Sequence, residues 1–252
     1  MKTLITCLFA LLITKVNAQL TTPDAIATSN GNVIVQPIFH AALALQWNGK
    51  SIYIDPYNGA DAYKNLQKPD LILITDIHGD HMDLKTLQAL DLSGATFIVP
   101  QAVANKLPGE WEQRIVVLSN GNTTDQSGIS ITAIPMYNLP DDSTARHTKG
   151  RGNGYVLTIG GKRFYISGDT EDIPEMRSLK NIDVAFVCMN LPFTMSVDQA
   201  ANAVLEFKPK IVYPYHYRAQ GGFSDTQQFK MLVNKDDPSI DVRLKDWYVG
   251  NK

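Results

Sequence analysis

The chain has 252 residues, enough for one large domain or two small ones and for a sizeable buried core. Hydrophobic residues make up 44% of it and charged residues 19%, which is ordinary for a globular protein of enzyme size. The formal net charge is -2 and no patch of clustered Lys or Arg occurs, which argues against a nucleic acid or an anionic membrane surface as the partner.

The first 18 residues, MKTLITCLFALLITKVNA, follow the order of a secretory signal. Lys2 supplies a basic start, an apolar stretch runs from Leu4 to Thr14, and Val16-Asn17-Ala18 forms a small-residue cleavage site. The apolar stretch is too short to span a membrane. We therefore expect cleavage after Ala18 and an exported protein, periplasmic or secreted, without a membrane span. The alternative is a retained N-terminal helix, buried or disordered.

The remaining segments alternate between strand and helix patterns, and we find no repeats and no low-complexity linker. Strands are predicted over 32–39, 41–47, 51–56, 71–75, 95–100, 114–118, 129–135, 183–189, 210–216 and 241–244, with a hairpin over 154–170 around Gly160-Gly161. Helices are predicted over 83–90, 101–107, 197–207 and 225–234, and a long polar loop over 138–153. Strand-rich meanders open both halves and helix–strand units close them. We therefore predict one α/β (α+β) domain over 19–252, with two mixed β-sheets flanked by helices.

Metal-ligating side chains recur just past the ends of predicted strands. Asp76 and His78 follow LILIT, Asp169 follows FYIS, and His216 follows IVYPY. Imidazole and carboxylate are preferred ligands of Zn(II), Mn(II) and Fe(II). Within TDIHGDHMD, the alternation D-x-H-x-D-H can direct side chains to two points a few ångströms apart. We therefore expect one or two divalent metal ions.

This stretch resembles the H-x-H-x-D-H signature of the metallo-β-lactamase superfamily, which also follows a buried strand. SIYIDP resembles the superfamily's strand ending in Asp-Pro, YISGDT its Gly-Asp-Thr segment, and YPYHYR its final histidine. FHAAL and NLPFTMSVDQAANAV resemble two segments of the ascorbate-6-phosphate lactonase-like branch. The resemblance covers residues 33 to 217 and implies a four-layer αββα sandwich.

Carried over position by position, the resemblance implies a set of ligands from four segments. Asp80, His81 and His216 would hold one ion, with Asp169 bridging to the other ion and His78 on that second ion's side. Asp55 matches a carboxylate that orients a motif histidine. In a metal-free protein each of these side chains would be an ordinary hydrogen-bonded loop residue.

Two positions depart from the signature. Asp76 stands where the first histidine is expected, and a carboxylate there favours harder cations or weakens the site. We therefore expect the ion on the Asp76 side to be lost first on chelation, and Asp76→His to shift preference toward Zn(II). The strand-tip histidine is also missing, and His147 in RHTKGRGNGYVL is the candidate that replaces it. The alternatives are Asn138 or Tyr137 as the ligand, with His147 exposed in its loop.

Three further side chains are candidates for contacts near the site. His40 could orient the substrate or a metal-bound water, or could satisfy carbonyl groups of the core. Arg151 and Lys149 could bind an anionic substrate, or could lie solvated in the loop.

These features predict a hydrolase that uses a metal-activated water on a small lactone, ester or phosphodiester. Asp80 or Asp169 would accept the proton of that water, with His40 beside them. No G-x-S-x-G nucleophile elbow occurs, which argues against a serine hydrolase. The alternative is a non-catalytic metal-binding or structural protein with a degraded first site, but burying so many ligands without metal is costly.

Overall fold

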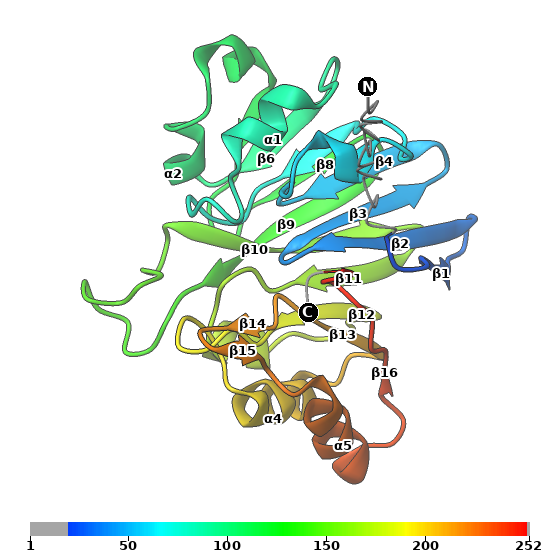
Figure 1. Cartoon of the computed structure of the whole chain (residues 1–252), viewed down its shortest axis with the longest axis vertical. Coiled ribbons are helices and arrows are strands. Elements are labelled where there is room, and N and C mark those ends of the chain that lie inside the picture. Colours follow the sequence, from blue (N-terminus) through cyan, green and yellow to red (C-terminus); the bar gives the residue numbers. More distant parts are fainter. Residues whose placement is uncertain (1–19, 251–252) are drawn as a thin grey trace, which may run out of the picture.

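The computed structural model describes residues 20–250, in which two seven-stranded sheets face each other (Figure 1). The predicted signal segment, residues 1–18, lies outside the described residues. No helix within 20–250 is long and apolar enough to cross a membrane.

The first sheet runs through the N-terminal half of the chain in sequence order. Its strands β1 to β4 pair antiparallel, and β4 to β7 pair parallel. The strands are β1 (Asp24–Ala27), β2 (Asn32–Phe39), β3 (Ala42–Trp47), β4 (Lys50–Ile54), β5 (Leu71–Leu73), β6 (Thr96–Val99) and β7 (Ile115–Val117).

The second sheet repeats this plan in the C-terminal half. Strands β8 to β11 pair antiparallel, and β11, β12, β13 and β16 pair parallel. The strands are β8 (Thr123–Gln126), β9 (Ile129–Met136), β10 (Gly152–Ile159), β11 (Lys162–Ile166), β12 (Val184–Cys188), β13 (Ile211–Tyr215) and β16 (Asp241–Val242), and a separate small hairpin joins β14 (Arg218–Ala219) to β15 (Gly222–Phe223).

Helices cover the outer face of each sheet (Figure 1). The first sheet carries α1 (Leu84–Ala89), α2 (Gln101–Ala104) and the 3-10 helices η1 (Ala60–Tyr63) and η2 (Gly109–Arg114). The second carries α3 (Pro174–Arg177), α4 (Val197–Phe207) and α5 (Thr226–Asp236). The largest apolar cluster draws side chains from both sheets, and a smaller one lies under α1, α2 and η2. The predicted αββα sandwich is therefore confirmed.

Local sequence accounts for the best-defined elements. In β5 the whole run Leu71–Leu73 is buried, as expected of a parallel strand covered on both faces. Helix α4 begins with a capping box in which the Ser196 side chain accepts from the backbone of Gln199 and the Gln199 side chain accepts in return. Cys188 ends β12 and is buried.

Several elements differ from the prediction. Strands β1 and β8, the β14–β15 hairpin, helix α3 and both 3-10 helices were not predicted, because they are short; β8 is also polar throughout. The predicted loop over 138–153 ends two residues early, since Gly152 and Asn153 already pair with β9. The predicted strand over 241–244 is only Asp241–Val242.

Candidate metal centre

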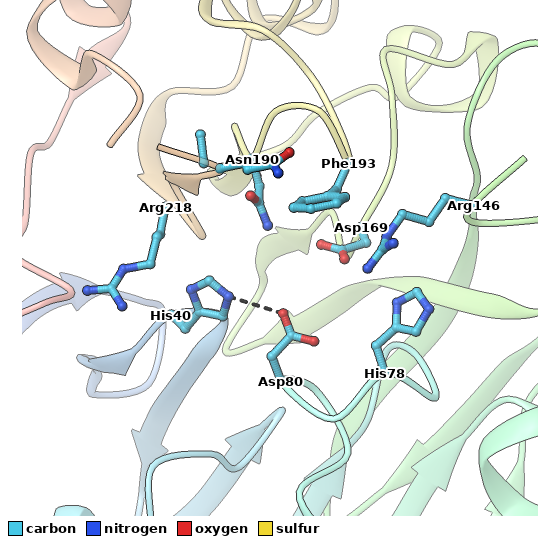
Figure 2. A pocket seen from close by; sticks show the side chains of 10 residues that line it. His40, His78, Asp80, Arg146, Asp169, Asn190, Phe193 and Arg218 are labelled. Carbon is cyan, nitrogen blue, oxygen red and sulfur yellow. Dashed lines mark hydrogen bonds and ion pairs between the residues drawn. The ribbon is translucent and has the colours of Figure 1, made fainter. Parts of the chain in front are cut away.

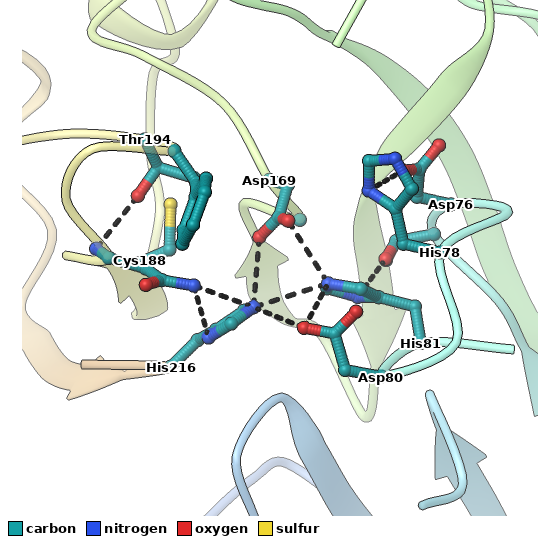
Figure 3. A network of polar contacts seen from close by, with 12 residues as sticks. Asp76, His78, Asp80, His81, Asp169, Cys188, Thr194 and His216 are labelled. Atoms are coloured by element: carbon teal, nitrogen blue, oxygen red, sulfur yellow. Dashed lines mark hydrogen bonds and ion pairs between the residues drawn. The ribbon is translucent and has the colours of Figure 1, made fainter. Parts of the chain in front are cut away.

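All five histidines of the chain meet at one edge of the sandwich, in loops that follow strands. The loop from β5 to α1 supplies two of them together with Asp76 and Asp80. The others come from the β2–β3, β9–β10 and post-β13 loops, and Asp169 follows β11 (Figure 3). The carboxyl ends of parallel strands bring such loops together at one sheet edge.

The first cluster consists of Asp76, His78 and His147, whose ligand atoms all lie within 4.8 Å of one another. His78 Nδ1 lies 2.9 Å from Asp76 Oδ2 and 3.3 Å from His147 Nε2. His147 Nε2 also lies 3.1 Å from Asp169 Oδ2. The loop before β10 therefore folds inward and brings His147 to the ligand atoms that it was predicted to join.

Asn138 supports His147 and does not replace it. The Asn138 side-chain oxygen accepts from both the backbone N–H and Nδ1 of His147, at 2.9 and 2.8 Å. This contact directs Nε2 into the cluster, toward His78 and Asp169. Tyr137 points away, with its hydroxyl donating to Glu175 at 2.8 Å. Of the three alternatives for the missing position, only His147 places a nitrogen in the cluster.

The second cluster consists of His81, Asp169 and His216, with Asp80 at its border. Asp169 places Oδ2 3.2 Å from His81 Nε2 and Oδ1 3.1 Å from His216 Nε2. The two imidazole Nε2 atoms face each other at 3.2 Å. Two ligands that share one tetrahedral ion at about 2.05 Å are separated by about 3.3 Å, so these spacings suit a shared cation.

A buried carboxylate holds His81 in place. Asp55 Oδ2 lies 2.8 Å from His81 Nδ1, and the Thr75 backbone N–H and hydroxyl donate to the same carboxylate. Burial raises the pKa of Asp55, although His81 and Thr75 oppose the rise. The predicted orienting role of Asp55 agrees with this placement.

Backbone strain gathers at the same edge. His40, Asp55 and His216 adopt φ values of 57°, 45° and 47°, in the left-handed region that non-glycine residues rarely occupy. Gly168, just before Asp169, has a φ of 62°, and a Cβ there would lie 2.6 Å from Met136 Sδ. A side chain at position 168 would displace the turn that presents Asp169.

The donor set fits a divalent cation. Asp169 Oδ1 is buried, and among the described residues no hydrogen bond of acceptable geometry reaches it, despite its closeness to His216. Burial lowers the pKa of His81, but Asp169, Asp55 and Asp80 outweigh that effect and hold the pKa well above its usual value. Burial raises the pKa of Asp169, but His81, His216 and His147 outweigh that effect and hold the pKa well below its usual value. The pocket of carboxylates thus requires positive charge at its centre.

His40 contacts the site and does not contribute to the core. Its Nε2 lies 3.1 Å from Asp80 Oδ2, and its Nδ1 lies 2.7 Å from the Tyr248 hydroxyl. Burial, reinforced by His216, lowers the pKa of His40 to about 4. A neutral ring can therefore accept from Tyr248 and donate to Asp80, which positions that carboxylate.

Arg151 and Lys149 are both engaged in ion pairs. Arg151 donates from Nε and Nη2 to the two oxygens of Asp76, at 3.0 and 2.8 Å, and Lys149 pairs with Glu175 at 2.8 Å. Neither is among the residues that line the cavity at the site, and the contact of these two side chains with a substrate stays a prediction.

A cavity of about 320 Å³ opens over both clusters (Figure 2). Arg146 and Arg218 lie at its two sides, and Phe193 and Asn190 lie between them. The sequence pattern did not predict Asn190, whose amide nitrogen lies 3.3 Å from His216 Nδ1 and whose Oδ1 is buried without a hydrogen bond to any described residue. Nor did it predict Tyr248, which contacts His40. Asn190 could have been found, since it follows a predicted strand as the other site residues do.

The profile of the β-lactamase superfamily domain matches residues 35–216, which contain every residue of the two clusters. The chain belongs to this superfamily. A metal-dependent hydrolase of Pyrococcus abyssi is 30% identical over 211 residues, covering 80% of this chain and 92% of the relative. The superfamily model thus spans the same segments as the resemblance in sequence.

Solved structures of the superfamily agree. A metal-dependent hydrolase from Parabacteroides distasonis superposes with a TM-score of 0.76 at 38% identity, covering 89% of this chain and 98% of that one. Igni18, a metallo hydrolase from Ignicoccus hospitalis, gives 0.72 at 24% identity, covering 85% and 95%, and shows the fold alone. The chain is therefore a metal-dependent hydrolase of the metallo-β-lactamase fold. The ascorbate-6-phosphate lactonase-like branch stays a prediction.

Proposed function

We propose that the protein hydrolyses a small lactone, ester or phosphodiester that carries negative charge. The observation that supports this proposal is the cavity of about 320 Å³, which has both ligand clusters at its base and an arginine at each side. A cavity of this size suits a small molecule. An anionic group bound at Arg146 or Arg218 would hold the scissile bond over the clusters.

The metal ligands of the proposed site are Asp76, His78, His147, Asp80, His81 and His216, with Asp169 shared. The bound ions would be Zn(II), Mn(II) or Fe(II), which this mixture of imidazole and carboxylate suits. A divalent ion lowers the pKa of a bound water and polarises a carbonyl or phosphoryl oxygen.

The chain's own groups supply binding and proton transfer. Asp80 is one-third exposed, lines the cavity and is held by His40, so it can accept a proton from the attacking water. The Arg146 guanidinium lies 4.2 Å from the centre of the Phe193 ring, which fixes its position at the rim. Asn190 lines the same cavity and contacts His216 through its amide nitrogen.

The test is turnover by purified protein reconstituted with Mn(II), Zn(II) or Fe(II) and verified by elemental analysis. The substrates are lactones, aryl esters and phosphodiesters, each in a neutral form and a carboxylate- or phosphate-bearing form, with a β-lactam for contrast. We expect the anionic forms to be preferred. Full metal occupancy without turnover of any substrate would support the non-catalytic alternative.

Removing the charge at Arg146 tests how the substrate is recognised. We expect Arg146→Gln to raise KM for the anionic substrate about tenfold, because a charge-assisted hydrogen bond is lost, and to leave kcat and the neutral substrate nearly unchanged. Lys149→Gln is the matched control, since this cation lies on the same loop and pairs with Glu175 instead. Equal losses for neutral and anionic substrates would contradict the proposal.

We also propose that the protein is exported to the periplasm or the medium as a single domain of residues 19–252. The support is the basic start, apolar stretch and small-residue site within residues 1–18. Intact-mass measurement of the exported protein should give a chain that begins at Gln19. A mass that includes Met1 would contradict cleavage.

A further inference from the structure

The two clusters contain matching donors. Each has one aspartate from the β5–α1 loop and two histidines. In the first cluster these are Asp76, His78 and His147. In the second they are His81 and His216, with Asp80 at the border, 4.0 and 3.6 Å from the two imidazoles. Both contact Asp169, the first through His147 at Oδ2 and the second through His81 at Oδ2 and His216 at Oδ1. On donor atoms alone, the two should bind divalent ions about equally well.

The surroundings of the two aspartates differ. Asp76 is fully buried, and the Arg151 guanidinium donates to both of its oxygens. Arginine keeps its charge at any pH at which a protein is folded, and this fork geometry is the strongest pairing available to a carboxylate. Arg151 Nη1 also donates to the Arg146 carbonyl at 2.7 Å, which holds the guanidinium in place. The negative charge of Asp76 is therefore cancelled within the protein.

Asp80 has no such partner. Its close contacts are with imidazoles, His40 at 3.1 Å, His216 at 3.6 Å and His81 at 4.0 Å, and no lysine or arginine among the described residues pairs with it. Its charge stays available to a cation. The first cluster therefore has a permanent positive charge, that of Arg151, on its aspartate, and the aspartate of the second cluster has none. The second cluster also has the Asp55 carboxylate behind His81, where the first has the neutral Asn138 behind His147.

We propose that Arg151 cancels the charge of Asp76 and thereby makes the first cluster the weaker and more readily exchanged of two metal sites. This inference rests on the proposed metal binding of both clusters. The lower metal affinity of the first cluster then comes from the Arg151 guanidinium, whereas the sequence pattern attributed it to the hardness of the Asp76 carboxylate. The expected effect of Asp76→His on Zn(II) binding changes as well. Asp76→His alone leaves Arg151 unpaired beside the ligands, so it should weaken Zn(II) binding at the first cluster.

Arg151→Gln is the direct test, read out as metal affinity. Stoichiometry comes from elemental analysis, and the two dissociation constants come from competition with a chromophoric chelator for Mn(II) and Zn(II). We expect the dissociation constant of the weaker site to fall about tenfold or more. The dissociation constant of the tighter site should change by less than about threefold, because groups that do not contact each other couple weakly. Lys149→Gln is the matched control and should change neither.

A double-mutant cycle isolates the coupling between the two residues. Asp76→His should lose about tenfold or more in Zn(II) affinity at the first cluster, and Asp76→His/Arg151→Gln should regain that loss. Additive effects of the two substitutions would overturn the inference. Weaker metal binding at the first cluster of Arg151→Gln would also overturn the inference, because the only role of Arg151 would then be to orient Asp76.

The second cluster serves as the internal control for folding. A variant that retains its tight equivalent is folded at the site. If Arg151→Gln no longer binds metal at the second cluster, Arg151→Lys is the variant to measure. It keeps the positive charge, so metal binding at the first cluster should not become tighter. Tighter binding there would overturn the inference. If the wild-type protein bound metal at neither cluster, the proposed function would fail, and not this inference alone.

Discussion

Replacing His216 with alanine is expected to abolish both the tight metal equivalent and hydrolysis. Its Nε2 lies 3.1 Å from Asp169 and 3.2 Å from His81, at the centre of the second cluster. Removing even a supporting partner of a metal ligand costs roughly 10- to 100-fold in affinity or activity, so the loss of the ligand itself should exceed that range. His81→Ala should have the same effect, with added destabilisation because the buried Asp55 carboxylate loses its imidazole partner and keeps only Thr75.

Elemental analysis and turnover of the same preparations check this prediction. His78→Ala is the control, because it removes a ligand from the first cluster and leaves Asp80, His81, Asp169 and His216 in place. That variant should retain one equivalent of metal. If His216→Ala bound two equivalents as tightly as the wild type, the assignment of ligands to clusters would be wrong.

Asp169→Asn is expected to have the widest effect, because both clusters use this carboxylate. Oδ2 lies within 3.2 Å of His81 and 3.1 Å of His147, and Oδ1 lies 3.1 Å from His216. The amide has nearly the same shape but loses the charge and turns one ligand oxygen into a donor. We therefore expect both equivalents to weaken together, by more than about 100-fold for the tight one, beyond the range for supporting groups.

Asp80→Asn is the control that distinguishes the bridging role of Asp169 from the effect of losing one negative charge at the site. It removes a carboxylate from the second cluster only, so the two dissociation constants should respond unequally. Chelator competition on both variants measures the difference. An Asp169→Asn protein that kept its weaker equivalent intact would show that Asp169 serves one cluster and does not bridge.

Much of this arrangement was predictable from local sequence. Strands β5, β11 and β13 each end in apolar or aromatic residues, and ligand-type side chains follow within three residues at Asp76, Asp169 and His216. The parallel strands within each sheet present such positions at the same edge, and the packing of the two sheets brings the two edges together. The positions of the main ligands therefore follow from pattern and topology together.

The partners of those ligands were less accessible from sequence. Arg151 meets Asp76 across 75 positions, and Tyr248 meets His40 across 208, so no spacing rule connects them. Loop conformation also decides between a ligand and its support. The inward fold before β10 makes His147 the member of the cluster and Asn138 its hydrogen-bond acceptor. Such roles depend on tertiary placement, which periodicity does not encode.

The origin of the second cluster has a consequence for folding. Asp80 and His81 follow a strand of the first sheet, whereas Asp169 and His216 follow strands of the second. Neither half of the chain contains the complete set, so a tightly bound ion selects molecules in which the two sheets have already docked. Each tenfold increase in free metal above the dissociation constant then adds about 1.4 kcal/mol to the stability of the docked form. Metal supply would thus buffer the protein against mutations that loosen the packing between its two halves.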